Sequence, residues 1–97
     1  MITQQQALNL LRDYKATRAS KYGIEKIGLF GSLARETQTE ESDIDIYIVG
    51  SLNGFCALAM IKTELEELLQ NRVDVVRLRE RMNPVLKKII EKEGIYV

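Results

Sequence analysis

The sequence predicts an α+β (α/β layered) domain in which helices pack on one face of a small mixed β-sheet. Stretches with apolar residues every three or four positions, typical of helices, alternate with short runs rich in β-branched residues, typical of strands. Their order is helix, strand, turn, strand, helix, strand, helix, strand, which favours helices layered on a sheet. The chain has 97 residues and no linker-like segment, so we expect one domain over residues 1–97.

The first helix is expected over residues 3–22. Thr3 and Gln6 match a capping box, and Gly23 is a natural C-terminal stop. Apolar residues at helical spacing should face the sheet, and the two tyrosines are expected to be half-buried packing residues. These positions are Ala7, Leu10, Leu11, Tyr14 and Tyr22.

Two strands and a turn should follow. We expect the first strand at residues 24–30, a short helical turn at 32–35, a polar loop at 37–42 and the second strand at 43–49. The sheet face that carries no helix is expected to be the open side of the molecule.

The second half of the chain predicts a helix from an Asn53 cap to about Asn71, and then a third strand at residues 72–76. Asn83 and Pro84 predict the start of the last helix. That helix should end at Gly94, before a closing edge strand at 95–97. The expected apolar stripe of the long helix is Phe55, Leu58, Ile61, Leu65, Leu68 and Leu69, with Glu64, Glu66 and Glu67 on its solvated face.

Composition excludes several kinds of site. The chain has no histidine, which excludes Ser-His-Asp and Cys-His catalysis. A single cysteine, Cys56, excludes an intramolecular disulfide, and we interpret it as a small packing residue. Fourteen basic and fourteen acidic residues give no net charge, so strong binding to nucleic acid or to an anionic membrane is not expected. No signal peptide is recognisable, which predicts a cytoplasmic protein.

Two aspartates mark the second strand as the candidate site. Asp43 and Asp45 are two residues apart, so on a strand they point to the same face. Two adjacent carboxylates repel each other, and a divalent cation relieves that repulsion. Oxygen ligands suit Mg²⁺, or Mn²⁺, better than a soft metal. Asp74 interrupts the valines of the third strand, either because it lies at an exposed end or because it joins this metal site.

A glycine–serine pair follows the first strand directly. Gly31 allows the backbone to approach a ligand closely, and the N–H groups of the turn after it can bind an anion. The hydroxyl of Ser32 adds one more donor for a phosphate oxygen. A phosphate cradle next to a metal-binding carboxylate pair indicates metal-assisted phosphoryl or nucleotidyl transfer.

The pattern Gly31-Ser32, then Ser42-Asp43-Ile44-Asp45, then Asp74 resembles the DNA polymerase β nucleotidyltransferase superfamily. Within it, LFGSLAR and SDIDIYIV are most similar to the minimal nucleotidyltransferases, which are usually encoded beside a helical HEPN-domain toxin. The resemblance implies the nucleotidyltransferase fold, two Mg²⁺ ions on Asp43, Asp45 and Asp74, and a nucleotide bound by Gly31, Ser32, Arg35 and Ser42. Relatives commonly have glycine where this chain has Glu36.

The resemblance further implies a reaction and a partner. AMP would pass from ATP to a hydroxyl of the HEPN toxin, such as that of a tyrosine, so that the chain acts as an antitoxin. Two alternatives are a binding-only antitoxin that occludes the toxin, and a nucleotidyltransferase that modifies a small molecule such as an antibiotic. The arginine-rich residues 77–81 are interpreted as a solvated linker, with contact to the triphosphate or to an acidic partner surface as the alternative.

Overall fold

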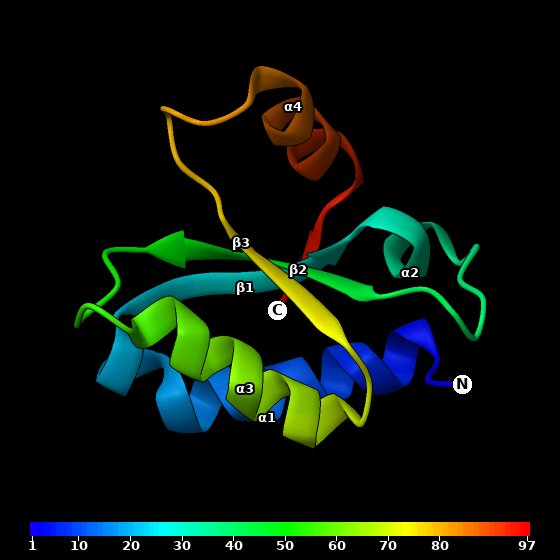
Figure 1. The fold of residues 1–97 in the computed structure, drawn as a ribbon, viewed down its shortest axis with the longest axis horizontal. Helices are drawn as coiled ribbons and strands as arrows, with labels where there is room; N and C mark the ends of the chain where they lie inside the picture. Colours follow the sequence, from blue (N-terminus) through cyan, green and yellow to red (C-terminus); the bar gives the residue numbers. More distant parts are fainter.

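The computed structural model describes residues 1–97, and four helices and four strands follow one another along the chain (Figure 1). The predicted order of helices and strands is confirmed. The elements are α1 (Gln4–Tyr22), β1 (Ile24–Phe30), α2 (Gly31–Arg35), β2 (Ile44–Gly50), α3 (Ala57–Leu69), β3 (Val73–Arg77), α4 (Pro84–Glu93) and β4 (Ile95–Tyr96).

The four strands form one mixed sheet in the order β3-β2-β1-β4. β1 pairs antiparallel with β2 and with β4, whereas β2 and β3 are parallel and are joined through α3. Parallel neighbours need such a crossover, because a tight hairpin reverses the chain direction. β3 is therefore one edge of the sheet and β4 is the other, and the predicted α+β class with a mixed sheet is confirmed.

Helices α1 and α3 cover one face of the sheet, as expected (Figure 1). Ile44, Ile46 and Ile48 of β2 are buried against them, together with buried leucines and isoleucines of both helices. The short helix α4 lies on the opposite side of the sheet, where Ile90 packs with Phe30 and Tyr47 in a smaller cluster. The expectation of helices on one face thus holds for α1 and α3, and α4 covers part of the other face.

Most predicted helix ends are confirmed. The Thr3 hydroxyl accepts a hydrogen bond from the backbone N–H of Gln6, whose side chain accepts from the N–H of Thr3, which is the predicted capping box. Gly23 ends α1 in the left-handed conformation, at φ 76°. Asn83 Oδ1 accepts from the backbone of Val85 and Leu86 at the start of α4.

The predicted start of α3 is wrong. The helix begins at Ala57, with Cys56 at the N-cap position, and not after Asn53. Asn53 instead fixes the loop to the end of α1, because its backbone N–H donates to the Tyr22 carbonyl at 2.8 Å. Cys56 is exposed rather than packed, because the chain is still in the loop there.

The predicted apolar stripe of α3 is partly wrong as well. Phe55 lies in the loop and is fully exposed, and the side chains of Leu58 and Leu68 are each 37% exposed. The stripe that packs on the sheet is narrower and repeats every four residues: Ala57, Ile61, Leu65 and Leu69. Only the central row of α3 is buried against the main core, and the flanking leucines stay accessible.

Two of the three glutamates on α3 are not simply solvated. Glu64 accepts hydrogen bonds from the hydroxyls of Tyr14 at 2.8 Å and Tyr22 at 2.9 Å, and Glu66 accepts from the backbone N–H of Val73. Burial would raise the pKa of Glu64, but the two tyrosine hydrogen bonds hold that pKa below its ordinary value. Both tyrosines are buried, which confirms their packing role, although they are more buried than the half-buried positions that the sequence predicts.

None of the helices combines the length and the apolar character that crossing a lipid bilayer requires.

Candidate active site

The three aspartates lie on or beside two neighbouring strands of the sheet. In register, Phe30 of β1 lies opposite Asp45 of β2, which in turn lies opposite Asp74 of β3. Paired residues point to the same face of a sheet, so the side chains of Asp45 and Asp74 are neighbours. Asp43 comes one residue before β2 begins, at the same end. The structure therefore brings all three predicted positions to one corner of the molecule.

The electrostatics of Asp45 reflect this arrangement. Its side chain is half-buried, whereas Asp43 and Asp74 are exposed. The pKa of Asp45 is raised, first by burial and then by the negative charges of Asp74 and Asp43, and the Arg35 guanidinium partly offsets this rise. Nearby like charges and partial burial are conditions that a bound cation relieves.

Gly31 connects β1 to this corner. Its φ is 72°, in the left-handed region that favours glycine. A Cβ at this position would overlap with Oδ2 of Asp45. Both the backbone conformation and the close approach therefore require glycine. Ser32 follows in the first turn of α2, where backbone N–H groups have no partner within the helix. The predicted cradle thus lies directly against Asp45.

Arg35 and Ser42 have other partners in the structure. Arg35 Nη1 contacts Glu93 Oε2 at 2.8 Å and thereby ties α2 to α4. The hydroxyl of Ser42 accepts from the backbone N–H of Thr39 at 3.0 Å and stabilises the loop before β2. Their assignment to nucleotide binding stays a prediction.

Arg72 is a residue of this corner that the sequence analysis missed. Its Nε lies 3.1 Å from Oδ1 of Asp43, and one of its terminal nitrogens donates to the Glu41 carbonyl. Because Ile44 pairs with Val73, residue 72 falls beside residue 43. Only the parallel register of β2 and β3 reveals this pair, and no motif in the sequence marks it.

Glu36 occupies the position where relatives commonly have glycine. It ends α2 in the left-handed conformation, at φ 60° and ψ 36°, and its N–H donates to the Leu33 carbonyl. The loop therefore has a left-handed backbone conformation that favours glycine, and the Cβ of Glu36 makes this conformation sterically less favourable. Glu36 thus adopts the conformation that a glycine at this position would adopt without strain.

The carboxylates at this corner are candidate ligands for a metal ion. No three acidic or cysteine side chains are gathered closely enough to enclose an ion, and Asp43 forms an ion pair with Arg72. The candidate ligands are all carboxylates, and the charges of Asp43 and Asp74 repel that of Asp45. Carboxylate oxygens suit Mg²⁺ or Mn²⁺. The residues fit a hard divalent cation in kind, and Asp43 would have to exchange Arg72 for it.

Comparisons with known proteins agree with this geometry. The family model "Polymerase beta, Nucleotidyltransferase" matches residues 13–97. The chain is 32% identical over 101 residues to the protein adenylyltransferase MntA of Thermococcus cleftensis, which covers all of this chain and 98% of that protein. It is 40% identical to MJ1379 of Methanocaldococcus jannaschii, a candidate protein adenylyltransferase, over the whole length of both.

The chain is also similar to solved structures of a minimal nucleotidyltransferase and of a toxin-antitoxin complex. A minimal nucleotidyltransferase matches 97% of this chain and 95% of its own, with a TM-score of 0.77 and 28% identity. A toxin-antitoxin complex with AMP-PNP contains a chain matched over 98% of this one and 72% of its own, with a TM-score of 0.70 and 28% identity. The glycine turn lies at the same corner of the sheet as the aspartates of β2 and β3. Because the family model also matches most of its length, this chain belongs to the polymerase beta nucleotidyltransferase family.

Proposed function

We propose that this protein transfers AMP from ATP to a tyrosine hydroxyl of a HEPN-family toxin and thereby acts as its antitoxin. The observation that carries the proposal is the close approach of Gly31 to Asp45, which is paired with Asp74. Relatives support it: one is named a protein adenylyltransferase, and a structure 25% identical to this chain contains a tri-AMPylated HEPN toxin from Shewanella oneidensis bound to its MNT antitoxin.

Gly31 and Ser32 would hold the β- and γ-phosphates of ATP. The glycine lets the backbone approach the phosphates, and the first N–H groups of α2 and the serine hydroxyl donate to their oxygens. The α-phosphate would then lie near Asp45, because Gly31 is in close contact with that side chain. Arg35 would add a charged contact if its guanidinium left Glu93, which it contacts at 2.8 Å, for the triphosphate. Ser42, at the end of the loop, would line the same side.

Asp43, Asp45 and Asp74 would hold two Mg²⁺ ions, with Mn²⁺ as a substitute. When bound, such ions polarise the α-phosphate and neutralise charge on the departing pyrophosphate. The acceptor oxygen forms a bond to the α-phosphorus, and the bond from that phosphorus to the bridging oxygen breaks, so that pyrophosphate leaves. The exposed carboxylate of Asp74 is positioned at the edge strand, where it could accept the proton of the acceptor hydroxyl.

Occlusion of the toxin without AMP transfer is the second candidate function. It is favoured by the ion pair between Asp43 and Arg72 and by the lack of a preformed three-carboxylate cluster. A protein that only binds its partner does not need these carboxylates to be free.

The test uses the product of the neighbouring gene, which the family resemblance predicts to be a HEPN-family protein, with ATP labelled at either the α- or the γ-phosphate. We expect label from the α-phosphate, and none from the γ-phosphate, on the partner. The double variant Asp43→Asn, Asp45→Asn should lose transfer by at least about 1000-fold, because it removes two charges that would hold the cations.

The matched control is Asp13→Asn, which removes an exposed carboxylate from α1, away from the sheet corner. It should leave transfer unchanged. A tight complex without any transfer would favour occlusion, and transfer that survives the double variant would overturn the proposed roles of the aspartates.

A further inference from the structure

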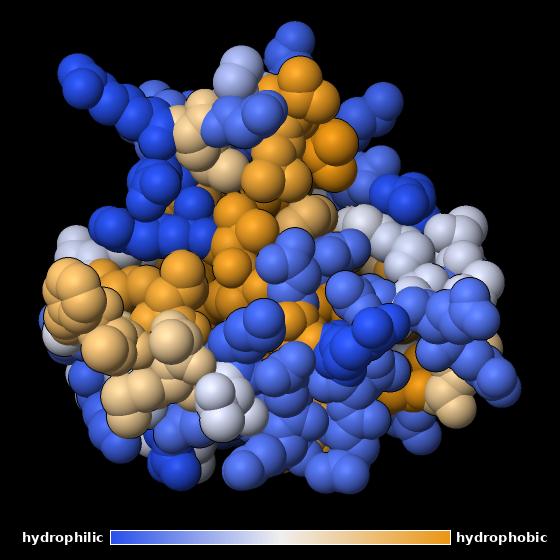
Figure 2. Space-filling model, viewed as in Figure 1, coloured by the Kyte–Doolittle hydropathy of each residue, from blue (hydrophilic) through white to orange (hydrophobic).

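An apolar groove lies next to the candidate active site, along the free edge of the sheet. Leu58 of α3, Val75 and Val76 of β3, and Met82 and Leu86 at α4 line it, and its volume is about 330 Å³. In the space-filling view, apolar side chains form a band from the start of α3 across β3 to α4 (Figure 2). Val85, on the first turn of α4, is 67% exposed, and Phe55, just before α3, is fully exposed. Exposed apolar side chains gathered beside a groove are typical of an interaction site.

The groove has a positively charged border. Arg77 and Arg79 line it, and neither contacts a carboxylate within 4.0 Å, although four other basic residues of the chain do. Arg77 Nε donates to the Gly50 carbonyl and Arg79 Nε to the Arg81 carbonyl, so both are held near the groove. Glu80, the acidic residue between them and Arg81, pairs with Lys87. The border therefore presents cations to a partner rather than to this chain.

The groove and the candidate active site share a strand. β3 carries Asp74 one residue after its start, and Val75, Val76 and Arg77 follow directly into the groove. A partner bound in the groove would therefore lie beside the carboxylates, in reach of a bound nucleotide.

We propose that this groove between α3, β3 and α4 binds an amphipathic helix of the HEPN partner, with acidic residues along the border of the helix's apolar face. The apolar positions lie on three elements rather than in one row along β3, which suits side chains spaced three and four apart on a helix better than an added strand. The carboxylates of that helix pair with Arg77 and Arg79. The inference rests on the proposed function for the identity of the partner.

The test measures the affinity of the full-length chain for the neighbouring gene's product, the expected HEPN-family partner, by calorimetry and without ATP. Leu58→Asp places a charge in the groove and should weaken binding by at least about 30-fold. Its control is Leu68→Asp, because Leu68 lies on the same helix, is equally exposed and does not line the groove. This control should bind like the wild type.

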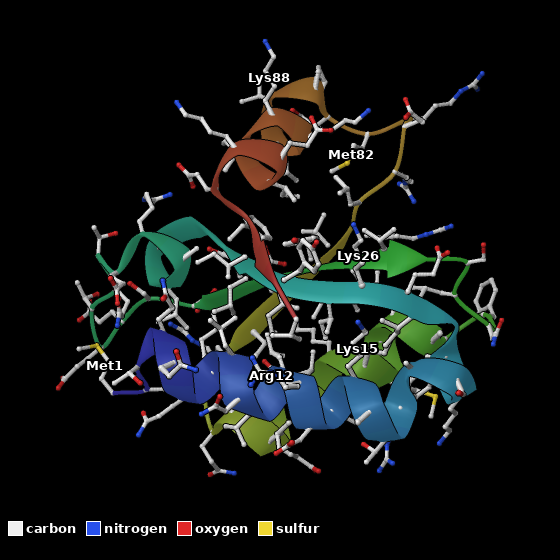
Figure 3. All side chains as sticks on the ribbon, turned by 180° about the vertical axis from the view of Figure 1, so that it is seen from behind. Met1, Arg12, Lys15, Lys26, Met82 and Lys88 are labelled. Carbon is white, nitrogen blue, oxygen red and sulfur yellow. The ribbon has the colours of Figure 1, made fainter.

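Charge reversal gives a second measurement that does not disturb the apolar packing. Arg77 is half-buried and its bond to the Gly50 carbonyl joins two distant segments, whereas Arg79 is exposed and bonds only to the carbonyl of Arg81, two residues away. The variant is therefore Arg79→Glu, which should weaken binding by about 10-fold and more at low ionic strength. The control is Lys88→Glu, because Lys88 lies on the outer side of α4, away from the sheet (Figure 3). It should have wild-type affinity.

The outcomes are decisive for the groove. Wild-type affinity in both Leu58→Asp and Arg79→Glu would refute the groove as the docking site. Equal losses of affinity in the variants and in their controls would refute it too. Wild-type protein that does not bind the HEPN partner would overturn the assigned occupant. Because binding is measured without ATP, a failure of AMP transfer with these affinity differences intact would refute the proposed reaction and leave the docking site standing.

Discussion

The two faces of β2 have opposite surroundings. Ile44, Ile46 and Ile48 face α1 and α3 and are at most 3% exposed, whereas Asp45 faces the other side, half-buried beside Gly31. The first face consists of closely packed apolar side chains. The second carries a carboxylate whose pKa is raised by burial and by its acidic neighbours. One strand thus supplies both a packed apolar face and a carboxylate that is unfavourable in its charged form, and alternation along the strand puts the two on opposite faces.

The first prediction removes the charge on the site face. Asp45→Asn should lower AMP transfer by at least about 1000-fold, because the carboxylate is the proposed cation ligand. The fold should be kept, since Asp45 is outside the main core. Transfer assays together with thermal unfolding distinguish these two effects, and a large loss of stability would show that Asp45 is structural.

The same variant predicts a pH dependence. The pKa of Asp45 in the folded state is raised above the ordinary value of 3.8. Ionisation of the carboxyl group therefore destabilises the folded state as the pH rises from 3.8 through the folded-state pKa. Asp45→Asn should therefore be more stable than the wild type at neutral pH, and the difference should vanish below about pH 3.8. Unfolding in denaturant at several pH values measures the difference. A variant less stable at neutral pH would contradict the assigned repulsion.

The second prediction concerns the next residue, on the packed face. Ile46 is fully buried, and Ile46→Ala should lower the free energy of unfolding by about 2–5 kcal/mol. Denaturant unfolding measures this loss. At temperatures where the variant remains folded, transfer should fall far less than in Asp45→Asn. Equal losses of transfer in both variants would mean that the two faces do not have separate roles.

The third prediction tests the polar link between α1 and α3 beneath the sheet. Glu64→Gln should lower the free energy of unfolding by about 1–2 kcal/mol. The two tyrosine hydroxyls donate to different oxygens of the charged carboxylate, whereas a glutamine amide is uncharged and has a single acceptor oxygen. The loss should shrink as pH falls through the lowered folded-state pKa of Glu64, where the wild-type carboxylate itself is protonated. The control Glu67→Gln, at an exposed position of the same helix, should be neutral.

The smallest expected effect is a gain in stability. Glu36→Gly should raise the free energy of unfolding by about 0.5–1 kcal/mol, because glycine adopts the left-handed conformation without the steric cost that Glu36 bears. Gln70→Gly, at the same conformation after α3, should behave alike. Glu36→Ala keeps a side chain there and should show no gain. If it stabilises equally, the charge of Glu36 and not its backbone is responsible.

Local patterns were sufficient to predict most of the fold. Capping residues such as Thr3 and Asn83, the glycine at position 23 and the alternation of Asp45 with the β2 isoleucines act over a few residues, so the sequence itself determines them. The predicted start of α3 was wrong because the backbone of Asn53 forms a hydrogen bond with the end of α1, a segment distant in the sequence.

The sequence by itself determined the α+β class, the order of elements and the polar positions from which the family resemblance follows. Only the tertiary structure decided their surroundings. The register of β2 and β3 places Arg72 beside Asp43 and Asp45 beside Asp74, and the packing of α4 forms the groove next to them. Register and packing depend on contacts between segments far apart in the chain, and no local pattern carries that information.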